Sequence, residues 1–385
     1  MRKDWEIKKL GDVCELYQPK TISSKEMIVN GKYSVFGANG IIGKYDKYNH
    51  EEPQLLITCR GATCGSVNIS LPKSWINGNA MVVRPLDKTL DLKFVEYLFR
   101  GGIDITKIIT GAAQPQITRQ NLSPILIRYP KSIKEQKIIV SILDDAFESI
   151  ERAKSNAEQN LKNTKELFDS YLQKIFVNKE DDWEEKTLGE LCYKITDGSH
   201  NPPKGIDYSA YLMLSSRDIY EEQIHFNKPR YLSKKDFESE NKRTAIQAGD
   251  VLLTIVGTIG RVAVVPTEFP NFTLQRSVAV LKPNNHIINS YFLKFILQNS
   301  LSLLISESRG AAQKGIYLNQ LKMIKISIPL ISKQHQIVKM LDLLFEETKK
   351  LESLYLQKLN DLEELKKSVL LKAFNGELRT SKISA

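Results

Sequence analysis

Apolar and small residues between Lys134 and Phe176 recur at steps of three and four, in a stretch that contains neither proline nor glycine. This spacing predicts one long helix with a coiled-coil seam, locally disturbed near its middle. The eleven seam positions are Ile139, Leu143, Ala146, Ile150, Ala153, Ala157, Leu161, Thr164, Leu167, Tyr171 and Ile175.

The same pattern returns 198 residues later, and the disturbance recurs at the same place. A helix of about 43 residues is about 65 Å long, and an apolar seam of that length must be buried against something. The eleven shifted positions, all apolar or threonine, are Ile337, Leu341, Leu344, Thr348, Leu351, Tyr355, Leu359, Leu362, Leu365, Val369 and Ala373.

The rest of the chain repeats as well. Asp4–Cys14 and Asp182–Cys192 are identical at seven of eleven positions. LLITCRGATCGSV aligns with VLLTIVGTIGRV, and GAAQ at 111–114 returns at 310–313. The offset rises from 178 at the opening to 195–199 afterwards, so the second copy has gained about 20 residues early on. The chain therefore consists of two copies of one unit, each a mixed strand-and-helix region followed by a long helix.

The predicted fold is mixed α/β (α+β), because the mixed regions combine short β-branched runs with glycine, proline and aromatic residues. Pseudo-twofold symmetry predicts that the two helices pair antiparallel and separate two similar globular domains. The first domain would then lie beside the end of the second helix. The alternative is that each helix packs separately on its own domain. The predicted segments are a first domain at 1–131, a central helix at 132–178, a second domain at 179–331, a C-terminal helix at 332–376 and a tail at 377–385.

Composition restricts the class of protein. The chain has 42% hydrophobic and 26% charged residues, no apolar run long enough to cross a bilayer, and no signal-peptide pattern at its start, so we expect a soluble cytoplasmic protein. The net charge of +10 fits a polyanion partner, most plausibly nucleic acid, and a soluble basic protein without such a partner is the alternative that charge alone leaves open. Four cysteines without neighbouring ligands at the right spacing predict neither a disulfide framework nor a metal site.

Several motifs resemble catalytic ones, but each lacks a necessary part. NPPK has Lys204 where adenine methyltransferases carry an aromatic residue, and GANGIIGK has the wrong glycine spacing for a phosphate loop. Glu6-x-Lys8 and its repeat Glu184-x-Lys186 have nuclease spacing without a clear partner acid, and the five histidines are scattered. We therefore expect no catalytic residue in this chain.

Several segments in combination resemble the specificity subunit of a type I restriction–modification enzyme. They are the openings DWEIKKLGDVCEL and DWEEKTLGELCYK, the segment VFGANGIIGKY, the pair GAAQPQI and GAAQKGI, and the helix segments IPLISKQHQIVKMLD and KKSVLLKAFNGEL. The resemblance covers essentially the whole chain and implies two target-recognition domains and two helical spacers. It also implies assembly with two modification subunits, which bind S-adenosylmethionine, and with ATP-dependent restriction subunits. We therefore expect S-adenosylmethionine, ATP and Mg in the partner subunits and no cofactor in this chain.

GANGIIG has no counterpart in the second domain, which carries DGSHNPPKGIDYSAYLMLSS instead, so the two domains are expected to recognise different sequences. Each domain would contact phosphates with lysine and arginine and read base edges with a few side chains of double-stranded DNA. The helix pair would fix the distance between the two half-sites and dock the modification subunits, into which the modified base would be extruded.

The candidate DNA contacts lie in the Gly-rich turns, after each GAAQ, and in polar segments where the copies differ. They are Lys44, Lys47, Arg60, Gln114, Gln116, Arg119, His200, Lys204, Arg217, Arg261, Lys314 and Tyr317. The seam residues chosen for the helix pair and its subunit interface are Ile139, Leu143, Ile150, Leu161, Tyr171, Ile337, Leu341, Leu351, Leu359 and Val369.

Two rival hypotheses come from other functional classes. A self-contained DNA methyltransferase or nuclease with a coiled-coil dimerisation element would modify DNA without other subunits. A coiled-coil scaffold without DNA would show no salt-dependent DNA binding.

Overall fold

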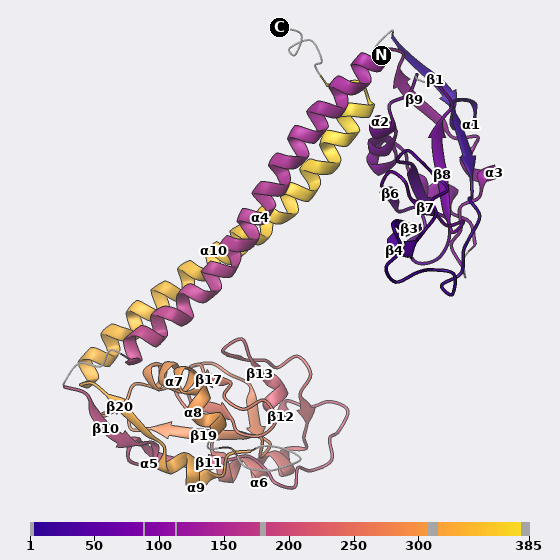
Figure 1. The fold of residues 1–385 in the computed structure, drawn as a ribbon. Coiled ribbons are helices and arrows are strands. Elements are labelled where there is room, and N and C mark those ends of the chain that lie inside the picture. Colours follow the sequence, from indigo (N-terminus) through magenta and orange to yellow (C-terminus); the bar gives the residue numbers. More distant parts are fainter. Residues whose placement is uncertain are drawn as a thin grey trace. The chain divides into compact units, whose positions relative to one another are not determined.

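The computed structural model describes residues 4–87, 89–111, 114–177, 182–306, 308 and 315–378. The chain forms two compact units, the first from Met1–Asn160 with Tyr355–Ala385 and the second from Leu161–Leu354. Each unit holds one mixed region and part of both long helices (Figure 1).

The mixed region of the first unit is built on a four-stranded antiparallel sheet of order β2-β8-β5-β6. Every residue of β5 is buried, as expected of an apolar strand inside a sheet. A smaller sheet has the order β4-β3-β7, and β1 pairs with β9. The strands are β1 (Trp5–Lys9), β2 (Cys14–Tyr17), β3 (Tyr33–Gly37), β4 (Gly40–Tyr45), β5 (Leu55–Thr58), β6 (Val67–Ile69), β7 (Trp75–Ile76), β8 (Ala80–Pro85) and β9 (Leu126–Pro130). The helical segments are α1 (Leu10–Val13), α2 (Leu92–Tyr97), η1 (Leu98–Gly102), η2 (Ile105–Ile108) and α3 (Arg119–Leu122).

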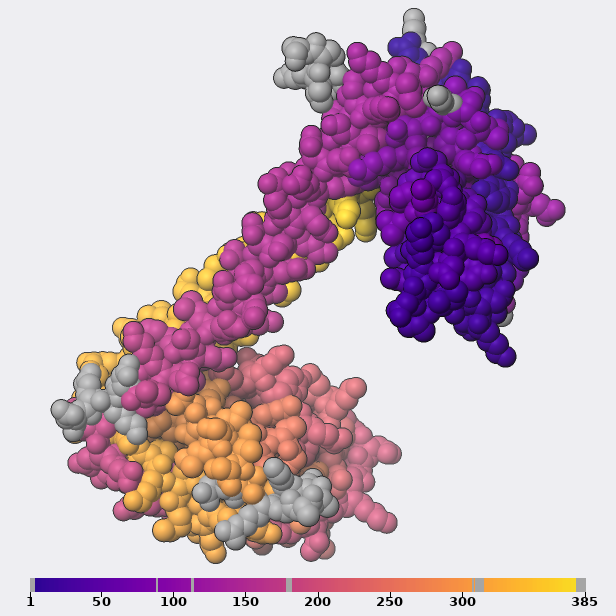
Figure 2. Space-filling model, in the orientation of Figure 1, coloured from indigo at the N-terminus to yellow at the C-terminus, as the bar shows by residue number. Residues whose placement is uncertain are grey.

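The mixed region of the second unit has the corresponding antiparallel sheet, of order β11-β19-β16-β17, and the corresponding outer pair β10-β20. In the space-filling view its salmon and orange atoms form one continuous body (Figure 2). The strands are β10 (Glu184–Thr187), β11 (Cys192–Asp197), β12 (Tyr211–Leu214), β13 (Ile219–Tyr220), β14 (Gln223–Ile224), β15 (Arg230–Tyr231), β16 (Val251–Thr254), β17 (Val262–Val264), β18 (Asn271–Leu274), β19 (Val278–Pro283) and β20 (Lys325–Ile328). The helical segments are α5 (Leu188–Leu191), η3 (Ser216–Asp218), α6 (Lys234–Thr244), α7 (Ser290–Asn299), α8 (Leu301–Ser306) and α9 (Leu318–Met323).

The two copies also share a strand pair that the sequence does not reveal. β3 runs parallel to β7 in the first unit, and β12 runs parallel to β18 in the second. β12 therefore takes the place of β3, which ends at Gly37, the first residue of GANGIIG. The strand beside it differs, because β4 follows in the first unit and β15 in the second. The extra residues of the second copy include α6, which lies between β15 and β16.

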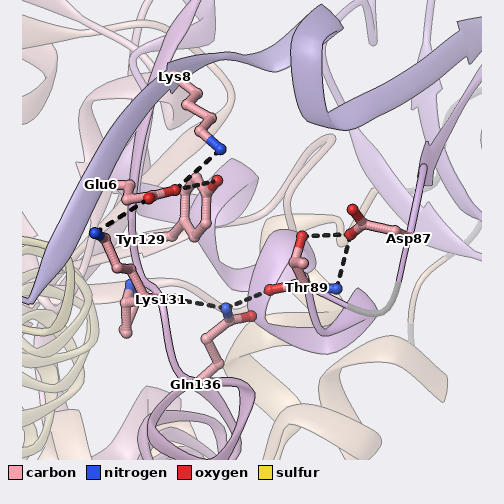
Figure 3. Close-up of polar contacts among 8 residues, drawn as sticks. Glu6, Lys8, Asp87, Thr89, Tyr129, Lys131 and Gln136 are labelled. Atoms are coloured by element: carbon pink, nitrogen blue, oxygen red, sulfur yellow. Dashed lines mark hydrogen bonds and ion pairs between the residues drawn. The ribbon is translucent and has the colours of Figure 1, made fainter.

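A buried glutamine joins each mixed region to its long helix in the same way. The side-chain nitrogen of Gln136 donates to the carbonyl oxygen of Thr89 (Figure 3) and to that of Pro130, and its oxygen accepts from the backbone N–H of Asp91, each at 2.8 Å. Asp91 in turn caps the N-terminus of α2. In the second unit Gln334 makes the same three bonds, to Ile287, Pro329 and Asn289, each at 2.9 Å. Both glutamines are fully buried.

The two long helices, α4 (Ile133–Val177) and α10 (Ile331–Phe374), run antiparallel within each unit. In the first unit Lys366 lies over the Phe147 ring at 5.5 Å, and further along α4 Lys154 pairs with Glu363 at 2.8 Å. In the second unit the rings of Phe168 and Phe345 are 5.5 Å apart, and the Tyr171 hydroxyl donates to Met340 Sδ at 3.2 Å. The predicted mixed α/β fold with an antiparallel helix pair is thus confirmed. None of the described helices combines the length and the apolar character needed to cross a bilayer.

Most of the predicted seam residues are buried or half-buried, and three are exposed. Ile139, Leu143, Ile150, Ile337 and Leu341 are buried, and Leu161, Tyr171, Leu359 and Val369 are half-buried. Leu351 is 38% exposed, and Leu167 and Leu365 are 48% exposed, so the assignment of these three to the helix seam is wrong. Leu351 follows buried Thr348 at the place where the seam spacing becomes irregular. A local change in the winding of the helix pair at such a place turns a residue of the regular pattern toward solvent.

The helices also pack on the mixed regions, through aromatic residues outside the predicted seam. In the first unit Phe374 of α10 meets Phe94, and Phe147 of α4 meets Tyr97, with ring centroids 5.4 and 5.3 Å apart. In the second unit Phe168 and Phe176 contact Phe295 and Phe292 of α7. The two arrangements considered from the sequence therefore coexist, because each helix buries one face on its partner and another on a mixed region. Trp5 belongs to the same core as Phe374, which places the opening segment beside the end of α10.

Candidate nucleic-acid interface

A Gly-rich turn follows the central strand of the main sheet in both units. In the first unit Thr58 and Ser66 close the turn, and the N–H of Gly65 donates to the carbonyl of Thr58 at 2.9 Å. In the second unit Thr254 and Arg261 close it, and the N–H of Gly260 donates to Thr254, also at 2.9 Å. Both glycines have φ above +90°, a conformation that favours glycine over residues with a Cβ. The turns are therefore equivalent, and the second is one residue shorter.

The segment after each GAAQ crosses this turn. The N–H of Ile117 donates to the carbonyl of Cys59, and that of Ile316 donates to Ile255, both at 2.9 Å. One residue earlier, the backbone of Gln116 forms an isolated antiparallel β-bridge with Arg60, and Gly315 forms the same bridge with Val256. We call the turn and the segment that crosses it the reading frame of each unit, as a name for this piece of backbone and not in the sense of translation. It consists of residues 59–65 with 115–117 in the first unit and residues 255–260 with 315–316 in the second.

The reading frame brings two predicted residues together and separates two others. Arg60 and Gln116 lie on adjacent backbone segments of the first unit. The sequence places Arg60 and Arg261 in equivalent turns, but they do not occupy equivalent positions. Arg60 corresponds to Val256, near the start of the turn, and Arg261 corresponds to Ser66, at its end. The guanidinium of Arg261 donates from Nη1 to the carbonyl of Ile219 at 3.3 Å. The positions that correspond between the units therefore carry different side chains.

In the first unit the β3–β4 hairpin rests on the reading frame. Asn39, at the tip of this hairpin, accepts a hydrogen bond from the hydroxyl of Thr58 at 2.8 Å and donates to that of Thr63 at 2.6 Å. The GANGIIGK segment is thus a tight turn held against the frame, as the sequence predicts. Lys44 on β4 and Lys47 just after it are both exposed. Asn39 was not among the predicted contacts, because an asparagine in a turn carries no distinctive signal.

In the second unit the reading frame borders a hollow of about 490 Å³. Two predicted residues, His200 and Tyr317, line it, and Tyr317 is 67% exposed. Two arginines that the sequence analysis missed, Arg243 and Arg276, line it as well. Arg243 comes from α6, which has no counterpart in the first copy, so the repeat gave no signal for it.

Asp197 organises one side of this hollow. It is only 5% exposed, and its Oδ1 accepts from Nη2 of Arg243 while its Oδ2 lies 2.8 Å from Nε2 of His200. Its backbone carbonyl accepts from Nε of Arg243 at 3.0 Å. A buried carboxylate needs such partners, because an unpaired charge inside a protein is costly.

The remaining candidates lie near these surfaces. Gln114, Arg119 and Lys204 are exposed, and Arg217 lies in η3 with its Nε 3.5 Å from the Ser215 hydroxyl. Arg230 donates to the carbonyl of Pro203 at 2.9 Å, so NPPK is held as a loop. Lys314 and most of both GAAQ segments lie outside the described residues. DNA contact by any of these side chains stays a prediction.

The nuclease-like Glu6-x-Lys8 motif serves to hold strands together. Glu6 pairs with Lys8 at 3.1 Å and with Lys131 at 3.4 Å, and it accepts from the Tyr129 hydroxyl at 3.2 Å (Figure 3). The hydrogen bond from Lys8 keeps the pKa of Glu6 below its usual value, and the same bond raises the pKa of Lys8. A carboxylate held in this way is a weak base. The second copy repeats the pair, with Lys186 3.0 Å from Glu184.

Three of the four cysteines are buried in surroundings that make their thiols unreactive. Burial raises the pKa of Cys14 and Cys192 to about 12 and that of Cys59 to about 11, so these side chains stay as neutral thiols at neutral pH. Across the described parts of the chain, no three His, Cys, Asp or Glu side chains come together in a way that could hold a metal ion.

Alkylation can test these thiol environments. At pH 8 we expect iodoacetamide to modify half-buried Cys64 first in the native protein, and Cys14, Cys59 and Cys192 only on denaturation. A pKa about three or four units above the pH leaves only about one thiol in a thousand or fewer ionised. Peptide mass spectrometry would follow each site, and fast modification of Cys14 or Cys192 in the native protein would contradict this description.

Comparison with known proteins identifies the family. Residues 2–161 and 180–363 match a protein-family model described as "Type I restriction modification DNA specificity domain". The chain belongs to this family. The two matched ranges each contain one mixed region with its reading frame, so the internal repeat is a repeat of the family's domain.

Two curated relatives are specificity subunits. The Escherichia coli type I restriction enzyme EcoBI specificity subunit is 28% identical over 293 residues, which cover 68% of this chain and 60% of that protein. The Haemophilus influenzae putative specificity subunit S.HindORF215P is 26% identical over 329 residues, which cover 82% of this chain and 80% of that protein.

Solved structures have the same fold. The HsdS subunit from Thermoanaerobacter tengcongensis is similar with a TM-score of 0.67 and 18% identity, over 98% of each chain. A chain from a structure described as showing complex assembly and conformational transition of the type I R-M system gives a TM-score of 0.75 and 18% identity, over 98% of this chain and 99% of that one.

Proposed function

We propose that this chain is the DNA-recognition subunit of a type I restriction–modification complex, in which each mixed region recognises one part of a split target in double-stranded DNA. The observation that carries the proposal is the reading frame, which is the same in both units. Its backbone hydrogen bonds coincide, while the side chains on it differ. A common support with different polar groups suits two recognition domains with different target sequences.

The charge of the chain supports a DNA partner. The chain carries a formal charge of +10. Arg60 on the first reading frame is exposed, and exposed Arg276 lines the hollow beside the second. Such side chains neutralise phosphates and release counterions, so binding should weaken as salt rises.

We assign no catalytic step to this chain. Its buried cysteines are neutral thiols, and the carboxylate of Glu6 forms ion pairs with Lys8 and Lys131. The partners in the proposal are two modification subunits that bind S-adenosylmethionine and restriction subunits that use ATP and Mg, all acting in the cytoplasm. The helices α4 and α10 would serve as the spacer and as the docking site for the modification subunits.

The test is to co-express the chain with the modification subunits of its host and to map methylated bases by long-read sequencing. We expect methylation at one split motif of two defined parts separated by unread positions, lost when this chain is omitted. The control is the purified chain alone with S-adenosylmethionine, which should leave DNA unmodified. Methylation by the chain alone would instead establish a self-contained methyltransferase.

A further inference from the structure

Arg243 is the side chain of the second unit whose geometry is best suited to base recognition. We propose that Arg243 recognises a guanine in the half-site of the second unit, and that Asp197 is the positioning residue that fixes its guanidinium. The proposal rests on the function proposed above and assigns one contact within it. It concerns residues that belong to the inserted helix α6 and the end of β11, which lie beside each other in the second unit (Figure 1).

The first argument is the orientation of the guanidinium. Nε of Arg243 donates to the backbone carbonyl of Asp197, and Nη2 donates to its carboxylate. Two bonds to one residue fix both the position and the plane of the group. A guanidinium has five N–H groups in a planar fork, so three remain, two on Nη1 and one on Nη2. Adjacent N–H groups on the two Nη atoms are the pair that contacts O6 and N7 of guanine.

The second argument is accessibility. The Arg243 side chain is 49% exposed and lines the 490 Å³ hollow beside the reading frame. The Asp197 side chain is only 8% exposed, so the arginine is open to an approaching DNA and the carboxylate is not. The arginine therefore presents donors to the outside from a support buried in the protein.

The third argument is the rigidity of the backbone that carries Arg243. The carbonyl of Arg243 accepts from Nζ of Lys194 at 2.7 Å, and that of Ala245, which caps α6, accepts from Nζ of Lys282 at 2.8 Å. Lys282 is held in turn by the buried carboxylate of Asp250 at 2.6 Å. A site fixed before binding loses less conformational entropy when it meets DNA.

The fourth argument distinguishes a base contact from a phosphate contact. The carboxylate of Asp197 cancels much of the charge of Arg243, which weakens a phosphate contact but leaves the hydrogen-bonding pattern of the free edge intact. Arg276, also at the hollow and exposed, forms no ion pair among the described residues and suits the phosphate role better. The first unit has no counterpart of α6, so this contact belongs to the second half-site alone.

The test uses the full complex with modification subunits and a library of targets in which each base pair of the split motif is varied. Arg243→Lys keeps the charge and loses the planar fork. We expect discrimination at one G·C pair of the second half-site to fall by roughly 5- to 150-fold, which is the range for a bidentate contact, with every other position unchanged. Asp197→Asn keeps the size of the side chain and removes its charge, and should reduce discrimination at the same base pair by a smaller factor.

Three controls separate the outcomes. Lys242→Ala changes the exposed neighbour on α6 and should leave the motif intact. The half-site of the first unit serves as an internal measure of folding and assembly in every variant. A uniform loss at all positions, or unchanged discrimination in Arg243→Lys, would overturn the assignment. A wild-type complex without any sequence preference would instead refute the proposed function itself.

Discussion

Replacing residues 1–131 with the first recognition domain of another family member is expected to change one part of the DNA target completely and to leave the other part unchanged. The reason lies in the reading frames. Each is closed by hydrogen bonds within its own unit, from Ile117 to Cys59 in the first and from Ile316 to Ile255 in the second. Among the residues that the structure describes, these frame hydrogen bonds use only residues of the same unit.

The graft must keep the contacts that join the mixed region to the helices. Phe94 and Tyr97 should be retained, because they pack on Phe374 of α10 and Phe147 of α4. Methylation mapping of the hybrid complex measures the outcome. The reciprocal replacement of residues 179–331 is the control and should alter only the other part of the target. A change in both parts after either graft would refute independent recognition.

Replacing the buried glutamines by leucine is expected to destabilise the chain strongly. Leucine is similar in size to glutamine but can make none of the three hydrogen bonds, so Gln334→Leu leaves two carbonyls and one N–H of the second unit buried without their partner. Buried groups that lose their partners cost about 1–3 kcal/mol each, so for three groups we expect a loss of about 3 kcal/mol or more in the free energy of unfolding. Gln136→Leu should have a similar effect on the first unit, where the same three bonds are present.

The matched control is Gln336→Leu, two residues along the same helix, where the side chain is exposed. A surface substitution of this kind should change stability by no more than about 0.5 kcal/mol. Urea denaturation followed by circular dichroism compares the variants. Equal midpoints for Gln334→Leu and Gln336→Leu would show that the glutamine bonds contribute little.

The helices and the repeat could be predicted from the sequence, because they depend on local periodicity and on identity between two segments. The same periodicity misplaced Leu351, since an apolar residue three positions after Thr348 fits the seam pattern as well as one four positions after it. Only the packing of the helices, which leaves Leu351 exposed, decides between the two steps. A seam assigned from spacing is therefore least reliable where the steps are irregular.

The candidate site was predicted less completely, because its parts are distant in sequence. Arg60 and Gln116 could be chosen from two repeated motifs, and the structure brings them together. Arg243 and Asp197 are 46 residues apart, on an inserted helix and a strand end, and neither lies in a repeated motif. The parallel pairing of β12 with β18 could not be predicted from the sequence for the same reason, because Asn271 lies sixty positions after its partner Tyr211.

The reading frame also bears on how such a protein can change its specificity during evolution. Its fold is maintained by main-chain atoms, such as the N–H of Ile117 and the carbonyl of Cys59, while Arg60 and Gln116 contribute their backbones to the bridge and leave their side chains for other uses. Main-chain bonds are available to almost any residue type. If these side chains contact DNA as proposed, mutations at these positions would carry little penalty in folding and would be selected mainly by the DNA that they favour, so single substitutions could give a lineage new targets.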